Sequence, residues 1–146
     1  MQTGLYTFIA LFMGVIYSIY LPMNSSVARY LGSPLTANVS FYAVAFATSI
    51  LIFIFFGKFE TIYKFKNVPP YLFLTGFISA FIVLGITFLI PKIGTRKLFI
   101  LLIAGQIIMA IIVSHFGVLE SPKDPITFRK IIGAILLFSG AMVSVI

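Results

Sequence analysis

Five long apolar runs alternate along the chain with short stretches that hold its charges, prolines and turn residues. The runs cover approximately residues 4–30, 34–56, 69–90, 96–119 and 127–146. A helix needs about 20 residues to cross the hydrocarbon interior of a bilayer, and each run has about that length. No run alternates polar and apolar residues with a period of two, as the strands of a membrane barrel do. The pattern predicts an all-α polytopic membrane protein with five transmembrane helices in a single transmembrane domain.

Turn residues between the runs predict where some helices begin and end. Ser33 followed by Pro34 is typical of a helix start, with a capping hydroxyl and a proline at the first helical position. Asp124 and Pro125 predict the start of the last helix in the same way, and Pro91 is expected to end the third. The predicted loops are therefore short.

Composition places the chain in a membrane and narrows its chemistry. Hydrophobic residues make up 61% of 146 positions and charged residues 9%, whereas soluble proteins have about half and about a quarter. We expect a multi-pass protein of the cell membrane, in a prokaryote the plasma membrane. The chain has no cysteine, one histidine and three carboxylates, so it predicts no metal site, no cofactor and no enzyme activity.

The net charge of +7 comes from basic residues in the short segments beside the helices, where they meet lipid headgroups rather than nucleic acid. With five spans, six basic residues share the side of the N-terminus: Lys58, Lys64, Lys66, Lys123, Arg129 and Lys130. Four lie on the other side: Arg29, Lys92, Arg96 and Lys97. Basic residues favour the cytoplasm, so a cytoplasmic N-terminus is favoured by two charges. Both a single orientation and insertion in both orientations, giving an antiparallel homodimer, fit this weak bias.

Polar side chains inside the apolar runs are the candidates for function. Residues 105–117, GQIIMAIIVSHFG, place Gln106, Ser114 and His115 at membrane depth. Such groups cost free energy unless another helix or a water-filled cavity satisfies them. On the first helix, Tyr17, Tyr20 and Asn24 are spaced by three and four residues and share one stripe.

Two interpretations of these residues remain open. The residues Tyr17, Tyr20, Asn24, Gln106 and Ser114 are predicted to bind a small substrate. Alternatively, the two amides are polar contacts between helices, worth about 1 kcal/mol each, and the tyrosines pack against neighbours.

His115 and Arg29 have the same ambiguity. His115 is a possible proton site, or an interfacial imidazole near the end of its helix. Arg29 is a possible contact for an anionic substrate or a headgroup, or simply extends its charged end to the interface.

Two stretches carry a resemblance to a known family. Residues 14–41, GVIYSIYLPMNSSVARYLGSPLTANVSF, combine a glycine, an asparagine, a Gly-Ser-Pro turn and a Ser-Phe pair. Residues 105–140 begin with Gly-Gln, continue through His-Phe-Gly and a loop with an acid and prolines, and include Arg129 and two later glycines. In this order the chain resembles the YdcZ-type family of the drug/metabolite transporter superfamily. Asn24 and Gln106 match the family pattern, whereas Tyr20 replaces a frequent glutamine and Ser114 a frequent acid.

The resemblance implies one five-helix half of an architecture whose larger relatives have ten helices in two inverted repeats. Such a half is expected to pair, as an antiparallel homodimer or with a homologous subunit. The expected function is transport of an unidentified small organic molecule through a central pocket between protomers. The alternative is a non-transporting membrane partner or assembly protein.

Overall fold

The computed structural model describes residues 2–145 and divides the chain into two compact units, Met1–Lys92 and Ile93–Ile146. Within the described residues there are five helices long and apolar enough to cross a membrane and no strand. The predicted all-α fold with five spans is therefore confirmed. Pairing into a ten-helix assembly stays a prediction.

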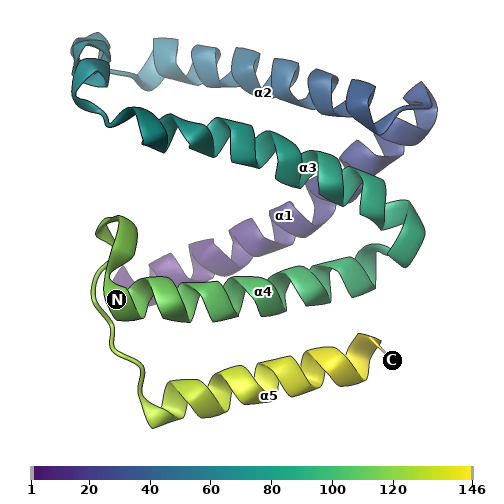
Figure 1. Cartoon of the computed structure of the whole chain (residues 1–146). Helices are drawn as coiled ribbons and strands as arrows, with labels where there is room; N and C mark the ends of the chain where they lie inside the picture. The colour runs from purple at the N-terminus through teal and green to yellow at the C-terminus, as the bar shows by residue number, and fades with distance from the viewer. Residues whose placement is uncertain (1, 146) are drawn as a thin grey trace. The chain divides into compact units, whose positions relative to one another are not determined.

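The first unit contains three long helices and a linker of 3₁₀ turns (Figure 1). They are α1 (Gln2–Leu31), α2 (Pro34–Phe56) and α3 (Leu74–Ile93), and α3 reaches the boundary of the unit. The linker between α2 and α3 is formed by η1 (Phe59–Asn67) and η2 (Pro70–Phe73). Because α1 and α2 are joined by a tight turn, they pack against each other along their connected ends.

The start of α2 agrees with its sequence signature. Ser33 is the N-cap, its side-chain oxygen accepts a hydrogen bond from the Thr36 amide, and Pro34 opens the helix. Gly32 precedes the cap with a φ of 68°, a left-handed conformation that glycine adopts without steric cost. This turn reverses the chain and brings the end of α1 beside the start of α2.

The second unit is a helical hairpin of α4 (Thr95–Phe116) and α5 (Phe128–Val145), connected by η3 (Val118–Glu120) and an extended loop. Small and branched residues line the groove between the helices, including Ile103, Ala104 and Gly140. Gly117 ends α4 in the left-handed conformation, with a φ of 64°.

Helix boundaries differ from the sequence prediction at four places. Helix α3 begins at Leu74 rather than at residue 69, since Pro70–Phe73 form the 3₁₀ helix η2. Helix α3 continues to Ile93, so Pro91 lies inside its last turn instead of ending it. Helix α4 ends at Phe116 rather than at residue 119, because Gly117 turns the backbone left-handed. Helix α5 begins at Phe128, where the Thr127 carbonyl accepts the first helical bonds, so Asp124 and Pro125 lie in the loop. The predicted end of this helix at Ile146 lies outside the described residues.

Most of the buried residues form a small polar and apolar core in the first unit, and in the second unit Leu98 and Phe99 of α4 are also buried. Leu21, Ala37 and Thr87 have no exposed surface, and Asn24 and Ser25 are almost fully buried. Outside this core most apolar side chains are exposed, and at most 17% of any spanning window is buried. Such a surface is unfavourable in water but matches the hydrocarbon of a bilayer.

Candidate functional site

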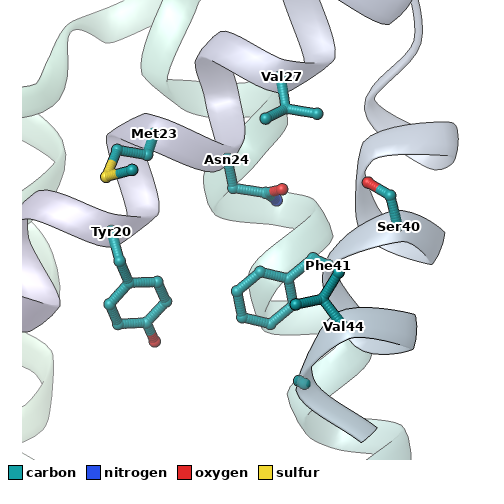
Figure 2. Close-up of a pocket in the computed structure, with 8 residues that line it drawn as sticks. Tyr20, Met23, Asn24, Val27, Ser40, Phe41 and Val44 are labelled. Carbon is teal, nitrogen blue, oxygen red and sulfur yellow. The ribbon is translucent and has the colours of Figure 1, made fainter. Parts of the chain in front are cut away.

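A groove between α1 and α2 is the candidate site of the first unit (Figure 2). It has a volume of about 370 Å³, within the usual range for small-molecule sites. Its lining from α1 is Tyr20, Met23, Asn24 and Val27, and its lining from α2 is Ser40, Phe41, Val44 and Ala45. The walls are mainly aromatic and aliphatic, with an amide and hydroxyl groups as the polar elements.

The aromatic wall is an ordered cluster. The Tyr20 and Phe41 rings stack with centroids 5.9 Å apart and planes 15° from parallel. The rings of Tyr17 and Tyr20 form a T-shaped pair with centroids 5.4 Å apart, and those of Phe41 and Tyr42 form another at 5.1 Å. Each ring therefore restricts the rotamers of its neighbour, and the wall presents defined aromatic surfaces to the groove.

Asn24 both lines this groove and holds α1 against α3. Its Nδ2 donates to Thr87 Oγ1 at 2.8 Å, and Thr87 Oγ1 in turn donates to the Val83 carbonyl. The adjacent Ser25 Oγ donates to the Thr87 carbonyl at 3.3 Å. The amide is thus fixed by a buried network, and its oxygen is left as the acceptor, because no further bond to it occurs among the described residues.

Sequence reasoning missed the polar residues of α3 that complete these contacts. Asn38 Nδ2 donates to the Ala80 carbonyl at 3.3 Å, and the Tyr42 hydroxyl lies 2.6 Å from Ser79 Oγ. With Thr87, these contacts join α3 to both preceding helices. The sequence could have indicated these contacts, because Ser79 and Thr87 are polar residues eight positions apart that fall on one side of the third apolar run.

The predicted binding residues divide between the two units. Tyr20 and Asn24 line the same groove, and Tyr17 contacts Tyr20. Gln106 is exposed on α4, in the second unit. Ser114, also on α4, donates its hydroxyl to the Ala110 carbonyl at 2.7 Å, so its own helix satisfies it.

His115 holds the loop that follows α4. Its Nδ1 accepts a hydrogen bond from the Ile126 amide at 3.2 Å, and its ring meets the edge of Phe116. The Ser114 carbonyl accepts a bond from the Asp124 amide at 2.9 Å, and Asp124 forms an ion pair with Lys130 of α5. The imidazole therefore has a structural partner in the loop, which the sequence did not indicate.

Arg29 lies in the last turn of α1 and is exposed. Its Nη2 donates to Ser26 Oγ at 3.0 Å, one helical turn earlier. This contact fixes the direction of the guanidinium group and leaves its other donors available.

These features define a multi-pass membrane protein whose polar residues lie at helix contacts and beside an aromatic groove. The chain belongs to the family described as "Putative inner membrane exporter, YdcZ", whose family model matches residues 5–143. The match confirms the resemblance, the location in the cell membrane and a transporter-like role, and an exporter family is not an enzyme class. No curated protein and no solved structure matches the chain.

Proposed function

We propose that the protein moves a small organic molecule across the membrane as an antiparallel homodimer, with the substrate pocket between the protomers. The groove at Tyr20, Asn24 and Phe41 is one protomer's share of that pocket. The observation that carries the proposal is that this groove combines a stacked aromatic wall with a buried amide and is open along one side. A second protomer would close it.

The lining favours a planar or apolar substrate with at most a delocalised positive charge. Aromatic faces attract cations and stack on flat rings, and the Asn24 oxygen can accept one hydrogen bond. All three carboxylates of the chain lie outside the spanning helices, at Glu60, Glu120 and Asp124. A proton-for-cation exchange based on a buried carboxylate is therefore not part of the proposal.

Ligand-dependent thermal stability of the purified protein tests the groove. We expect a planar aromatic cation such as ethidium, or a neutral aromatic of similar size, to raise the melting temperature. Tyr20→Ala and Phe41→Ala are expected to weaken binding by roughly two- to thirty-fold, which corresponds to about 0.5–2 kcal/mol for loss of an aromatic contact. Phe55→Ala is the matched control, since Phe55 lies on the same helix as Phe41, is 77% exposed and does not line the groove.

The same compounds should then be followed across proteoliposome membranes. Uptake that depends on the protein and falls in the Tyr20 and Phe41 variants, but not in the Phe55 variant, supports transport. If no compound of the panel shifts the stability of the parent protein or crosses the membrane, the proposal fails.

The alternative is a membrane partner or assembly role without transport, and the bond between Asn24 and Thr87 favours it because it uses the amide for helix packing. Asn24→Ala separates the two functions when it is combined with Gln106→Leu. Under transport, these changes reduce ligand stabilisation more than they reduce the stability of the ligand-free protein. Under an assembly role, the two substitutions reduce only the stability of the ligand-free protein.

Orientation is tested by labelling single cysteines in a chain that has none of its own. Asn67→Cys in η1 and Tyr30→Cys near the end of α1 both replace exposed, uncharged residues on opposite sides of the predicted membrane. Neither alters the balance of basic residues. An impermeant thiol reagent applied to intact cells should label each position about half if both orientations occur, whereas full labelling at one and none at the other would exclude the antiparallel homodimer.

A further inference from the structure

A second hollow in the first unit lies where α1 and α3 end and α2 begins. Its volume is about 330 Å³, and its lining includes Ser25, Arg29, Pro34, Phe88 and Lys92. Arg29 and Lys92 come from the last turns of two different helices. Two cations therefore converge on one pocket at the level where charged side chains meet lipid headgroups.

Neither cation is neutralised within the unit. Among the described side chains, Arg29 bonds to the Ser26 hydroxyl, and Lys92 Nζ lies 4.6 Å from the centre of the Phe88 ring. The single carboxylate in the sequence of this unit, Glu60, belongs to η1 at the opposite end of α2 and α3. The pocket therefore has two positive side chains without a carboxylate counter-ion among the described residues of the unit.

An apolar groove continues from this pocket along α3, beside the first residues of α2. Its volume is about 480 Å³, and its lining includes Leu35, Phe81, Leu84 and Gly85. Pro34 and Phe88 line both the groove and the cationic pocket, so the two hollows adjoin. Lys92 lies over the same Phe88 ring that begins the apolar part.

The combined site extends through most of one leaflet of a bilayer. From Lys92 to Phe81 the helix advances eleven residues, or about 16 Å at 1.5 Å per residue. One leaflet with its headgroup region is about 20 Å thick, and its hydrocarbon part is about 15 Å. The apolar groove from Phe88 to Phe81 covers seven residues of α3, or about 10 Å of that hydrocarbon. A cationic pocket at the interface followed by an apolar groove of this depth has the charge and length for a phospholipid headgroup and the upper part of one acyl chain.

We propose that this surface binds an anionic phospholipid, with its phosphate between Arg29 and Lys92 and the upper part of one acyl chain in the groove along α3. Basic pockets between membrane helices attract anionic headgroups, with each cation near the surface contributing about a five-fold gain in binding. The apolar groove distinguishes a lipid from a soluble anion, because a free phosphate has nothing to place there. The site is separate from the groove at Tyr20 and does not depend on transport.

Lipid retention by the purified full-length protein tests this site. The probes are dioleoyl phosphatidylglycerol, dioleoyl phosphatidylcholine with the same chains and no net charge, and inorganic phosphate. Native mass spectrometry and thermal stability are expected to show preferential binding of the phosphatidylglycerol. Arg29→Gln and Lys92→Gln should each weaken that binding about five-fold. Lys58→Gln, the same change of charge at the opposite end of the unit, should leave it unchanged.

The acyl groove has its own variant and control. Gly85→Leu places a side chain in the groove, and no heavy atom lies within 4 Å of the added Cβ. It should weaken binding of the dioleoyl lipid, whereas Gly76→Leu, on the same helix and outside the groove lining, should not. Circular dichroism melts in phosphatidylcholine identify any variant that has lost its fold, and the remaining variants still decide the question.

Three results would overturn the proposal. One is equal retention of the two dioleoyl lipids by the parent protein. Another is unchanged phosphatidylglycerol binding in both cation variants and in Gly85→Leu. The third is stabilisation by inorganic phosphate equal to that by the lipid, which would identify a site for a soluble anion instead.

Discussion

The side chain of Asn24 illustrates how one residue serves packing and a candidate site together. Its nitrogen is bonded to Thr87, while the residue also forms part of the wall of the aromatic groove. In hydrocarbon a lone amide is costly, so the bond to α3 stabilises the position from which the oxygen can meet a ligand. The packing role of the nitrogen therefore leaves the oxygen free for the proposed binding role, and the Asn24 and Gln106 variants distinguish the two.

The strength of the bond between Asn24 and Thr87 can be measured with a double-mutant cycle. We expect Asn24→Leu and Thr87→Val each to lower the free energy of unfolding, with a coupling of about 1 kcal/mol, the usual size for polar contacts between membrane helices. Reversible unfolding in mixed detergent provides the measurement. Ser49→Ala is the control, since the Ser49 hydroxyl bonds only to Ala45 of its own helix among the described residues. A coupling near zero would mean that the pair does not hold the helices together.

His115 is expected to act through its acceptor nitrogen. His115→Phe keeps an aromatic ring beside Phe116 but removes the partner of the Ile126 amide. The loop should then open more often, and hydrogen exchange at Ile126 should become faster, while exchange in the middle of α4 stays unchanged. Unaltered exchange at Ile126 would argue against this role.

The connection between α4 and α5 depends on a left-handed turn rather than on a charged or proline cap. Gly117 has a φ of 64°, and a Cβ at this position would lie 2.6 Å from Lys123 Cγ. A side chain here meets both backbone strain and a side-chain clash, whereas Gly105 in the middle of α4 has open space around it. A side chain is therefore expected to be tolerated at Gly105 and to be unfavourable at Gly117.

Replacing each of these glycines with alanine tests the difference. Gly117→Ala is expected to lower stability by about 1–2 kcal/mol, the cost of a left-handed residue with a side chain. Gly105→Ala should be neutral or stabilising by about 0.5–1 kcal/mol, because alanine favours the helix. Thermal unfolding of the two variants in the same detergent makes the comparison, and equal effects would contradict it.

The chain as a whole carries a charge balance that determines how it inserts. Six basic residues on one predicted side and four on the other give a weak orientation signal. If both orientations occur, a small change in this balance should move the population between them. This dependence distinguishes insertion in both orientations from a strongly directed chain.

Charge variants measured with the Asn67→Cys reporter test this sensitivity. Lys64→Gln with Lys66→Gln makes the balance four to four and should increase the share of chains with an external N-terminus. Replacing Thr61 with lysine makes it seven to four and should decrease that share. A labelled fraction that stays constant across these variants would indicate that loop charge does not set the topology.

Some of the fold and of the candidate site could be predicted, and the reasons differ from residue to residue. The start of α2 at Ser33 and Pro34 was correct because capping acts within one turn of the chain. The end of α3 predicted at Pro91 was wrong, since the helix continues through this proline to Ile93. Helical spacing predicted that Tyr20 and Asn24 share one side of α1. It could not predict their partners on other helices, which are Phe41 of α2 for the Tyr20 ring and Thr87 of α3 for the Asn24 amide.

Hydropathy and length alone established the five spans and the membrane location, because the cost of burying charge in lipid is summed along each local segment. The family resemblance came from the order of short motifs in residues 14–41 and 105–140. Which groups bond to which depended on how the helices face one another. Asn24 bonds to Thr87, which is 63 positions away in the sequence, and Arg29 shares a pocket with Lys92, which is also 63 positions away. Contacts at such separation arise from helix packing, which spacing along one helix cannot specify.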